Sequence, residues 1–237
     1  MGWGYDYYSK PSVAQQRAKA QKQLAKLRKA NPDISPVLVE GSKIAKTWWG
    51  SAWCKNLERY ADFSNRIGRG RSYIKNGFVL DLNISEGLIT AKVSGSSVYD
   101  VIIQIDSFSA KKWKSIEALC AKRIDSLTAL AEGKFPEELG EIFMKQEDGL
   151  FPSPKEIHMD CSCPDWATMC KHVAAALYAV GARLDTDPLL FFSLRGIDPS
   201  ELIKKTVDEK MKSLLANAEK KTERVIAEKD IMRIFGV

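Results

Sequence analysis

Three cysteines and a histidine gather in one dozen residues of the chain: Cys161, Cys163, Cys170 and His172. The whole chain of 237 residues has 5 cysteines and 2 histidines, so chance explains this gathering poorly. Three thiolates and one imidazole form a soft donor set that suits tetrahedral Zn²⁺ and leaves no coordination position open for a substrate. We therefore predict a structural zinc site made of these four side chains.

The spacing of the four ligands indicates which elements must position them. Cys161 and Cys163 stand two residues apart, so in an extended strand both side chains point to the same side. A Pro-Asp pair follows and predicts a turn back toward the ion. Cys170 and His172 are also two apart, which does not fit one helical face, so we expect a helix to begin there. The alanine-rich segment 173–180 is the predicted helix.

Other readings of the cluster are weaker. A nucleophilic Cys170 with His172 as its base lacks a third orienting group, and a thiolate saturated by metal is quenched. A disulfide redox pair is disfavoured in a reducing compartment and leaves two ligands unused. An iron–sulfur cluster with one histidine ligand stays open as an alternative. Cys54 and Cys120 lie in apolar helical stripes and are expected to be buried small hydrophobes.

The ligand pattern, Cys-x-Cys, six residues, then Cys-x-His, resembles the SWIM zinc finger. Further stretches look like the bacterial SWIM zinc finger family proteins, over roughly residues 1 to 200: 47–50, 53–60, 69–73, 149–152 and 187–196. The resemblance implies zinc at the four ligands and a module made of a hairpin and a helix. It also implies a DNA-binding or protein-binding role and association with Swi/Snf-type ATPases.

Positive charge is concentrated at the start of the chain. Residues 1–30 carry seven cations and one anion, which accounts for the whole net charge of +6. The composition of residues 12–30 predicts a helix, and such a basic arm is attracted to polyanions. The alternative is a solvated helix that serves solubility alone.

A second cationic stretch, residues 65–77, contains glycines and one tyrosine, and we expect a loop there. Guanidinium groups beside an aromatic ring favour phosphate contact with base stacking, and the alternative is a solvated loop. Lys171 stands between two zinc ligands, where it either contacts phosphate or offsets the charge of the zinc site. The candidate nucleic-acid contacts are therefore Arg66, Arg69, Arg71, Tyr73, Lys75 and Lys171.

The remaining pattern predicts an α+β fold. Residues 47–60 place tryptophans on one helical face, as in a helix that packs on a core. Three β-branched runs separated by short turns predict an antiparallel meander: 78–84, 88–93 and 98–105. Helices are expected at 111–131 and 136–144. The expected domains are a basic arm and linker at 1–36, an α+β domain at 37–150, the zinc finger at 151–196 and a helical C-terminal segment at 197–237.

The function expected from these features is that of a non-catalytic zinc-binding adaptor. No phosphate-binding loop, catalytic triad or placed pair of carboxylates is found, so we do not expect an enzyme. The adaptor is expected to bind nucleic acid, a protein partner such as a Swi/Snf-type ATPase, or both. The alternative is a pure protein-interaction module. No apolar run reaches the roughly 20 residues of a membrane-spanning helix and no leader segment is evident, so a cytoplasmic location is expected.

Overall fold

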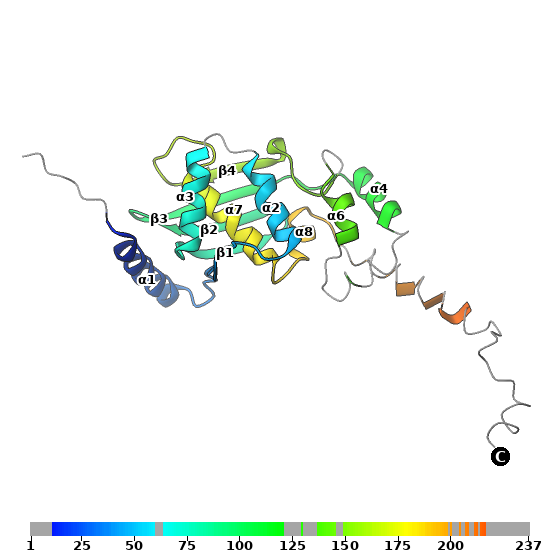
Figure 1. Cartoon of the computed structure of the whole chain (residues 1–237), viewed down its shortest axis with the longest axis horizontal. Coiled ribbons are helices and arrows are strands. Elements are labelled where there is room, and N and C mark those ends of the chain that lie inside the picture. Colours follow the sequence, from blue (N-terminus) through cyan, green and yellow to red (C-terminus); the bar gives the residue numbers. More distant parts are fainter. Residues whose placement is uncertain are drawn as a thin grey trace, which may run out of the picture.

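A four-stranded antiparallel sheet forms one layer of the protein (Figure 1). This computed structural model describes residues 11–59, 64–120, 137–145 and 149–198, with isolated positions at 129 and between 200 and 216. The strands follow each other in chain order: β1 (Val79–Ser85), β2 (Leu88–Ser94), β3 (Val98–Ile105) and β4 (Ile157–Cys161). The predicted α+β class and meander are confirmed. The strand of the zinc-binding segment, β4, pairs with β3 as a fourth strand of the meander.

The strands β2 and β3 have one buried face and one more polar face, as their residue pattern requires. On β3, Val101, Ile103 and Ile105 are buried, and the residues between them are exposed. β2 repeats this alternation and lies in register with β3, so that the apolar side chains of both strands meet on the same face. Gly87 closes the first hairpin with a φ of 63°, a backbone conformation that favours glycine.

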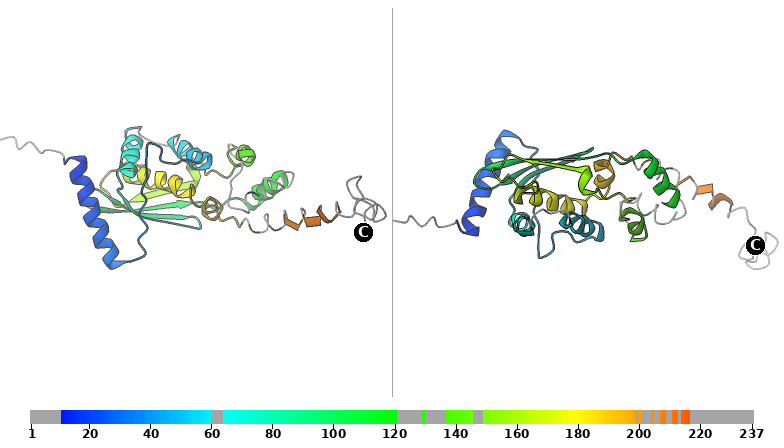
Figure 2. Two further views of the ribbon diagram at one scale, coloured as in Figure 1. Left: turned by 60° about the horizontal axis from the view of Figure 1, so that its bottom comes forward. Right: turned by 90° about the horizontal axis from the view of Figure 1, so that it is seen from above.

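The helix α7 (Lys171–Leu184) lies in the centre of the molecule. Figure 2 shows three layers in its right-hand view: the sheet, then α7, then the pair α2 (Trp48–Glu58) and α3 (Ser64–Lys75). Every residue from His172 to Gly181 is buried. This run has no charged side chain apart from the histidine at its start, and a helix that is apolar on all sides must be covered on all sides.

Close packing between these helices depends on small residues. A Cβ added at Gly70 of α3 would lie 2.5 Å from the Cβ of Ala174 in α7, and one added at Gly50 of α2 would lie 2.6 Å from the carbonyl oxygen of Gly181. Trp53 of α2 is fully buried and donates its indole N–H to the Leu177 carbonyl at 2.9 Å. The predicted core role of the 47–60 helix is therefore confirmed.

The expectation of a loop around residues 65–77 was wrong, because residues 64–75 form the helix α3. Its glycines cost roughly 1 kcal/mol each in helix propensity. The burial of Ile67 and Ile74, with Gly70 against α7 between them, offsets that cost. Gly70 is thus required by close contact and not by a turn.

The basic arm is a helix, α1 (Val13–Ala30), with a capping box between Ser12 and Gln15. It crosses one end of the sheet (Figure 2), where Ala20 packs against Phe78 and Leu80. Lys19 Nζ also donates to the Ser96 carbonyl at 2.6 Å. The arm is therefore docked on the body over its described length, although its apolar face is thin.

The remaining elements close the other end of the sheet: α4 (Ala110–Cys120), α6 (Glu137–Phe143), the short 3₁₀ helix η1 (Pro154–Glu156) and α8 (Leu190–Leu194). The helix predicted at 111–131 is described as far as 120, and the one predicted at 136–144 corresponds to α6. Residues 121–131 of the first of these helices lie outside the described residues, apart from position 129. The Cys120 side chain and most of the predicted C-terminal helix also lie outside them. Among the helices that are described, none has the length and apolarity to span a bilayer.

An ion pair between the buried Arg195, which follows α8, and Glu156 of η1 lies beside the sheet. Arg195 is 1% exposed and donates to a Glu156 carboxylate oxygen at 2.6 Å and to the Asp106 carbonyl at 2.7 Å. Burial raises the pKa of Glu156, but hydrogen bonds from Arg195 and Ser153 outweigh it and hold that pKa below its ordinary value.

Glu156→Gln tests this pair. The change leaves the Arg195 charge buried without a counter-charge, so we expect the free energy of unfolding near neutral pH to fall by about 3 kcal/mol in denaturant titrations. Because the folded-state pKa of Glu156 is depressed, its contribution exists above the ordinary glutamate pKa of about 4.3 and disappears as the pH falls through the folded-state value. Equal losses for the variant at neutral and strongly acidic pH would contradict this account.

Two glycines of α3 form a matched pair for testing the helix contact. A Cβ at Gly68 meets nothing within 4 Å, so Gly68→Ala should stabilise the protein by up to about 1 kcal/mol through helix propensity. The same change at Gly70 forces α3 away from α7, so Gly70→Ala should destabilise it by at least about 1 kcal/mol. Chemical denaturation measures both, and equal effects would refute the packing argument.

Candidate metal centre

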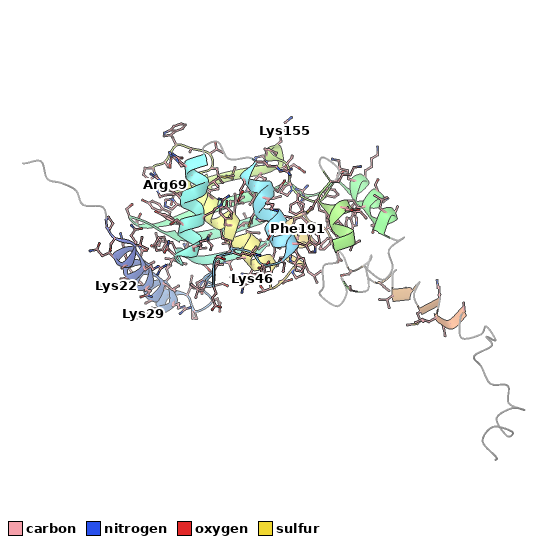
Figure 3. All side chains as sticks on the ribbon, viewed as in Figure 1. Lys22, Lys29, Lys46, Arg69, Lys155 and Phe191 are labelled. Atoms are coloured by element: carbon pink, nitrogen blue, oxygen red, sulfur yellow. The ribbon has the colours of Figure 1, made fainter. Side chains whose placement is uncertain are left out.

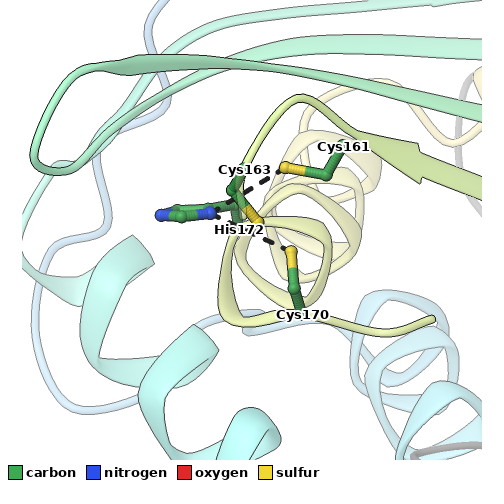
Figure 4. Close-up of side chains that lie close together, drawn as sticks. All are labelled: Cys161, Cys163, Cys170 and His172. Carbon is green, nitrogen blue, oxygen red and sulfur yellow. Dashed lines mark hydrogen bonds between the residues drawn. The ribbon is translucent and has the colours of Figure 1, made fainter. Parts of the chain in front are cut away.

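The end of β4 and the start of α7 bring the four predicted ligands together (Figure 4). Cys161 is the last residue of β4, Cys163 lies in the turn that follows, Cys170 is the N-cap of α7 and His172 is in its first turn. The four ligand atoms all lie within 4.8 Å of one another. The chain therefore produces the predicted strand, turn and helix start around one point.

The spacing of the ligand atoms fits a zinc ion. The Nδ1 atom of His172 lies 3.9 Å from the Sγ atoms of both Cys161 and Cys170. Zn–S bonds of about 2.3 Å and Zn–N bonds of about 2.0 Å set tetrahedral ligand separations of about 3.5 to 3.8 Å. Three sulfurs and one nitrogen at this spacing form a zinc-binding site. When bound, the ion supplies a structural cross-link between the strand and the helix.

The start of α7 prepares the site for a thiolate. Cys170 Sγ accepts a hydrogen bond from the backbone N–H of Val173 at 3.5 Å, as an N-cap side chain does. Hydrogen bonds from Cys161, then from His172 and Val173, lower the pKa of Cys170 to about 3. The contact with Cys170 raises the pKa of Cys161 in turn. Because cysteine binds zinc as a thiolate, metal binding at this site releases thiol protons.

Aromatic rings from two other elements hold the His172 ring. Tyr99 of β3 lies 4.4 Å from it between ring centroids, and Tyr73 of α3 lies 5.5 Å from it. The Nε2 atom is buried without a hydrogen-bond partner in the described part of the chain, and a Cβ on Gly95 would lie 3.1 Å from it. Packing thus orients the ring so that Nδ1 faces the sulfurs.

Comparison with known families identifies this segment. Residues 153–181 match the SWIM zinc finger family. These residues form a SWIM zinc finger. The match includes all four ligands, β4 and the first part of α7.

A longer similarity is found to the uncharacterized protein Rv2102 of Mycobacterium tuberculosis. The two sequences are 36% identical over 163 residues, which is 68% of this chain and 58% of the length of that relative. No solved structure matches the chain.

Of the predicted nucleic-acid contacts, Arg66 holds the SWIM finger against α3. Its guanidinium Nε and Nη2 atoms each lie 3.1 Å from an oxygen of Asp165, in the loop between the two ligand pairs. This bidentate pairing lowers the pKa of Asp165. The finger loop is also tied to β3, because Ser162 and Asp100 exchange hydrogen bonds of 2.9 and 3.0 Å.

Arg71 is engaged on the other side of α3. Its guanidinium lies 2.6 Å from a Glu58 oxygen and donates to the hydroxyl of Tyr178 at 2.8 Å. These contacts join α3 to α2 and α7, away from the zinc ligands. Lys75, at the C-terminal end of α3, lines the same region.

The other three candidates lie beside the SWIM finger. Arg69 is exposed on the outer side of α3 (Figure 3), and the ammonium of Lys171 lies 5.9 Å from the centre of the Tyr73 ring. The contribution of Tyr99 and Gly95 was missed because only the pairing of β3 with β4 brings them to the ligands, and no local sequence signal marks them. Trp166 in the finger loop is 80% exposed.

Two cysteine variants test the metal centre. Cys170→Ser removes a ligand and the N-cap thiolate, so purified protein should contain much less than one zinc per chain by elemental analysis. Because zinc contributes an apparent ~10–16 kcal/mol to the folding of finger peptides, the variant should also lose several kcal/mol of stability.

Cys54→Ser is the matched control, because Cys54 is buried in α2 against Gly181 and is not a ligand. It should keep full zinc content in the same assay. Stoichiometric zinc in Cys170→Ser, or loss of zinc in Cys54→Ser, would contradict the assignment.

Proposed function

We propose that this protein is a non-catalytic, cytoplasmic adaptor whose zinc-stabilised surface binds nucleic acid through phosphate groups and also binds a protein partner, such as a Swi/Snf-type ATPase. The observation that carries the proposal is the grouping of Arg69, Lys171 and two tyrosines around the SWIM finger. Cations for phosphates and rings for stacking are the parts that such contacts need.

The docked α1 helix adds positive charge to the proposed nucleic-acid surface. Its exposed cations have no ion-pair partner within the described residues: Lys22, Lys26, Arg28 and Lys29. Lys22 and Lys29 are labelled on α1 in Figure 3. Because Lys19 binds the β2–β3 hairpin at Ser96, three residues from Tyr99, α1 begins its basic row close to the finger. A rigid row of cations binds a polyanion with less loss of chain entropy than a free arm.

The absence of catalysis is part of the proposal. Among the described residues, the one cluster with metal-ligand geometry is the Cys₃His set. Four protein ligands complete a tetrahedral zinc, which leaves no position for an activated water. Free thiols at the ligand positions also suit the reducing cytoplasm.

Trp166 favours the second candidate, a module for protein interaction alone. A tryptophan that is 80% exposed on a loop fixed by an ion pair suits an anchor for a pocket on a protein partner. The partner is then the sole target, and the cations around the finger contribute only to solubility.

A salt titration separates the two candidates. Wild-type protein is expected to bind generic DNA at low salt, and the double variant Arg69→Gln with Lys171→Gln should lower the slope of log K against log salt by about 1.5. Lys111→Gln with Lys114→Gln on α4 removes the same charge at exposed positions away from the finger. Zinc content is measured in every variant. No binding by wild type, or equal slopes for the two double variants, would remove the nucleic-acid proposal for this surface.

A further inference from the structure

A hollow of about 330 Å³ lies between α2 and α3, on the side of α3 that faces away from the zinc ligands. Four cations line it: Lys43 from the segment before α2, Lys55 from α2, and Arg71 and Lys75 from α3. Glu58 contributes the only carboxylate of the lining. A hollow of this size is in the range of ligand-binding sites.

The carboxylate is already neutralised by its neighbours. Glu58 Oε1 lies 2.6 Å from Arg71 Nη2 and accepts a hydrogen bond from the Tyr178 hydroxyl at 2.7 Å. Arg71 Nε donates to the same hydroxyl at 2.8 Å, which closes a triangle at the floor of the hollow. The mutual hydrogen bonds raise the pKa of Arg71, so the floor is a fixed, neutral pair.

The three lysines above this floor have no counter-charge. Lys43, Lys55 and Lys75 are exposed, and none makes an ion pair or side-chain hydrogen bond within the described part of the chain. Three ammonium groups around one hollow repel one another, and an anion bound between them offsets that repulsion. The hollow therefore carries a local charge of about +3 and favours a ligand with several negative groups.

A second hollow of about 320 Å³ adjoins the first, because Ser51 and Lys55 line both. Its lining differs in chemistry: Trp48 and Phe151 supply aromatic surface, and Asn56 supplies an amide. Ala52 lies in the same wall. An aromatic hollow next to a cationic one fits a base beside its backbone phosphates.

We propose that these two hollows together bind a single-stranded nucleic acid, with its phosphates over Lys43, Lys55 and Lys75 and a base in the aromatic hollow. A single strand is required because bases in a duplex are paired and stacked and cannot enter such a hollow. This inference rests on the proposed nucleic-acid function and locates it on a surface separate from the SWIM finger. An acidic protein segment offers no flat base for the aromatic hollow.

The charge part of the inference is tested with the zinc-loaded full chain and a fluorescent oligo(dT) of about 12 nucleotides, within the usual site size of such proteins. In fluorescence anisotropy, the triple variant Lys43→Gln, Lys55→Gln and Lys75→Gln should lower the salt slope by about 2. The matched control removes the same charge from exposed positions outside the hollows, at Lys111, Lys114 and Lys155. It should retain the wild-type slope.

The base part is tested by filling the aromatic hollow. Ala52→Gln should weaken binding of the single strand at least about fivefold and leave binding of a duplex of the same length unchanged. Ala118→Gln on the exposed side of α4 is the control for adding the same side chain to a helix.

The outcomes separate this inference from the proposed function. If wild type binds single strands and both the triple lysine variant and Ala52→Gln bind them equally well, the hollows are not the site. The proposed function then stands elsewhere on the surface. If wild type binds no nucleic acid, both this inference and the proposed nucleic-acid function are refuted. Displacement of oligo(dT) by an acidic polypeptide at equal concentration of charged groups would also overturn the assignment, because it would show that the base contributes nothing.

Discussion

The burial of α7 on every side is the constraint on which the rest of the structure depends. The helix has alanine and aliphatic residues around its whole circumference, so the sheet and the α2–α3 pair must cover opposite sides of it. Its N-terminus carries two zinc ligands, and β4, one strand of its covering sheet, carries a third. The metal centre thus fixes the N-terminal end of α7, the helix that organises the core. Bound zinc therefore stabilises the whole fold.

Local sequence signals predicted much of this arrangement. The Cys-x-Cys and Cys-x-His pairs are short-range patterns, and the strand-turn-helix geometry follows from their spacing. The meander was predictable for the same reason, since its β-branched runs are separated by short turns. The fourth strand was not placed, because its pairing with β3 joins residues more than fifty positions apart, and no local pattern records such a contact.

The glycines of α3 show why local patterns can mislead. Gly68 and Gly70 predict a loop when only backbone freedom is considered, but Gly70 is required because Ala174 lies against it. The nearby arginines were predicted to act together as phosphate contacts, because only their positions in the sequence were considered. Arg66 pairs with Asp165 and Arg71 with Glu58, and both acids are supplied by other parts of the chain. Only the tertiary structure distinguishes cations that hold layers together from those that face solvent.

The position of β4 in a shared sheet limits how the SWIM finger can be used outside its native chain. A finger that folds as an independent domain can be excised or transplanted between proteins. Here, a peptide of residues 153–181 would expose the apolar sides of α7 and leave β4 without the neighbour that aligns it. The family segment is therefore one part of a larger cooperative unit, and a transplanted finger needs boundaries that retain the meander and both covering helices.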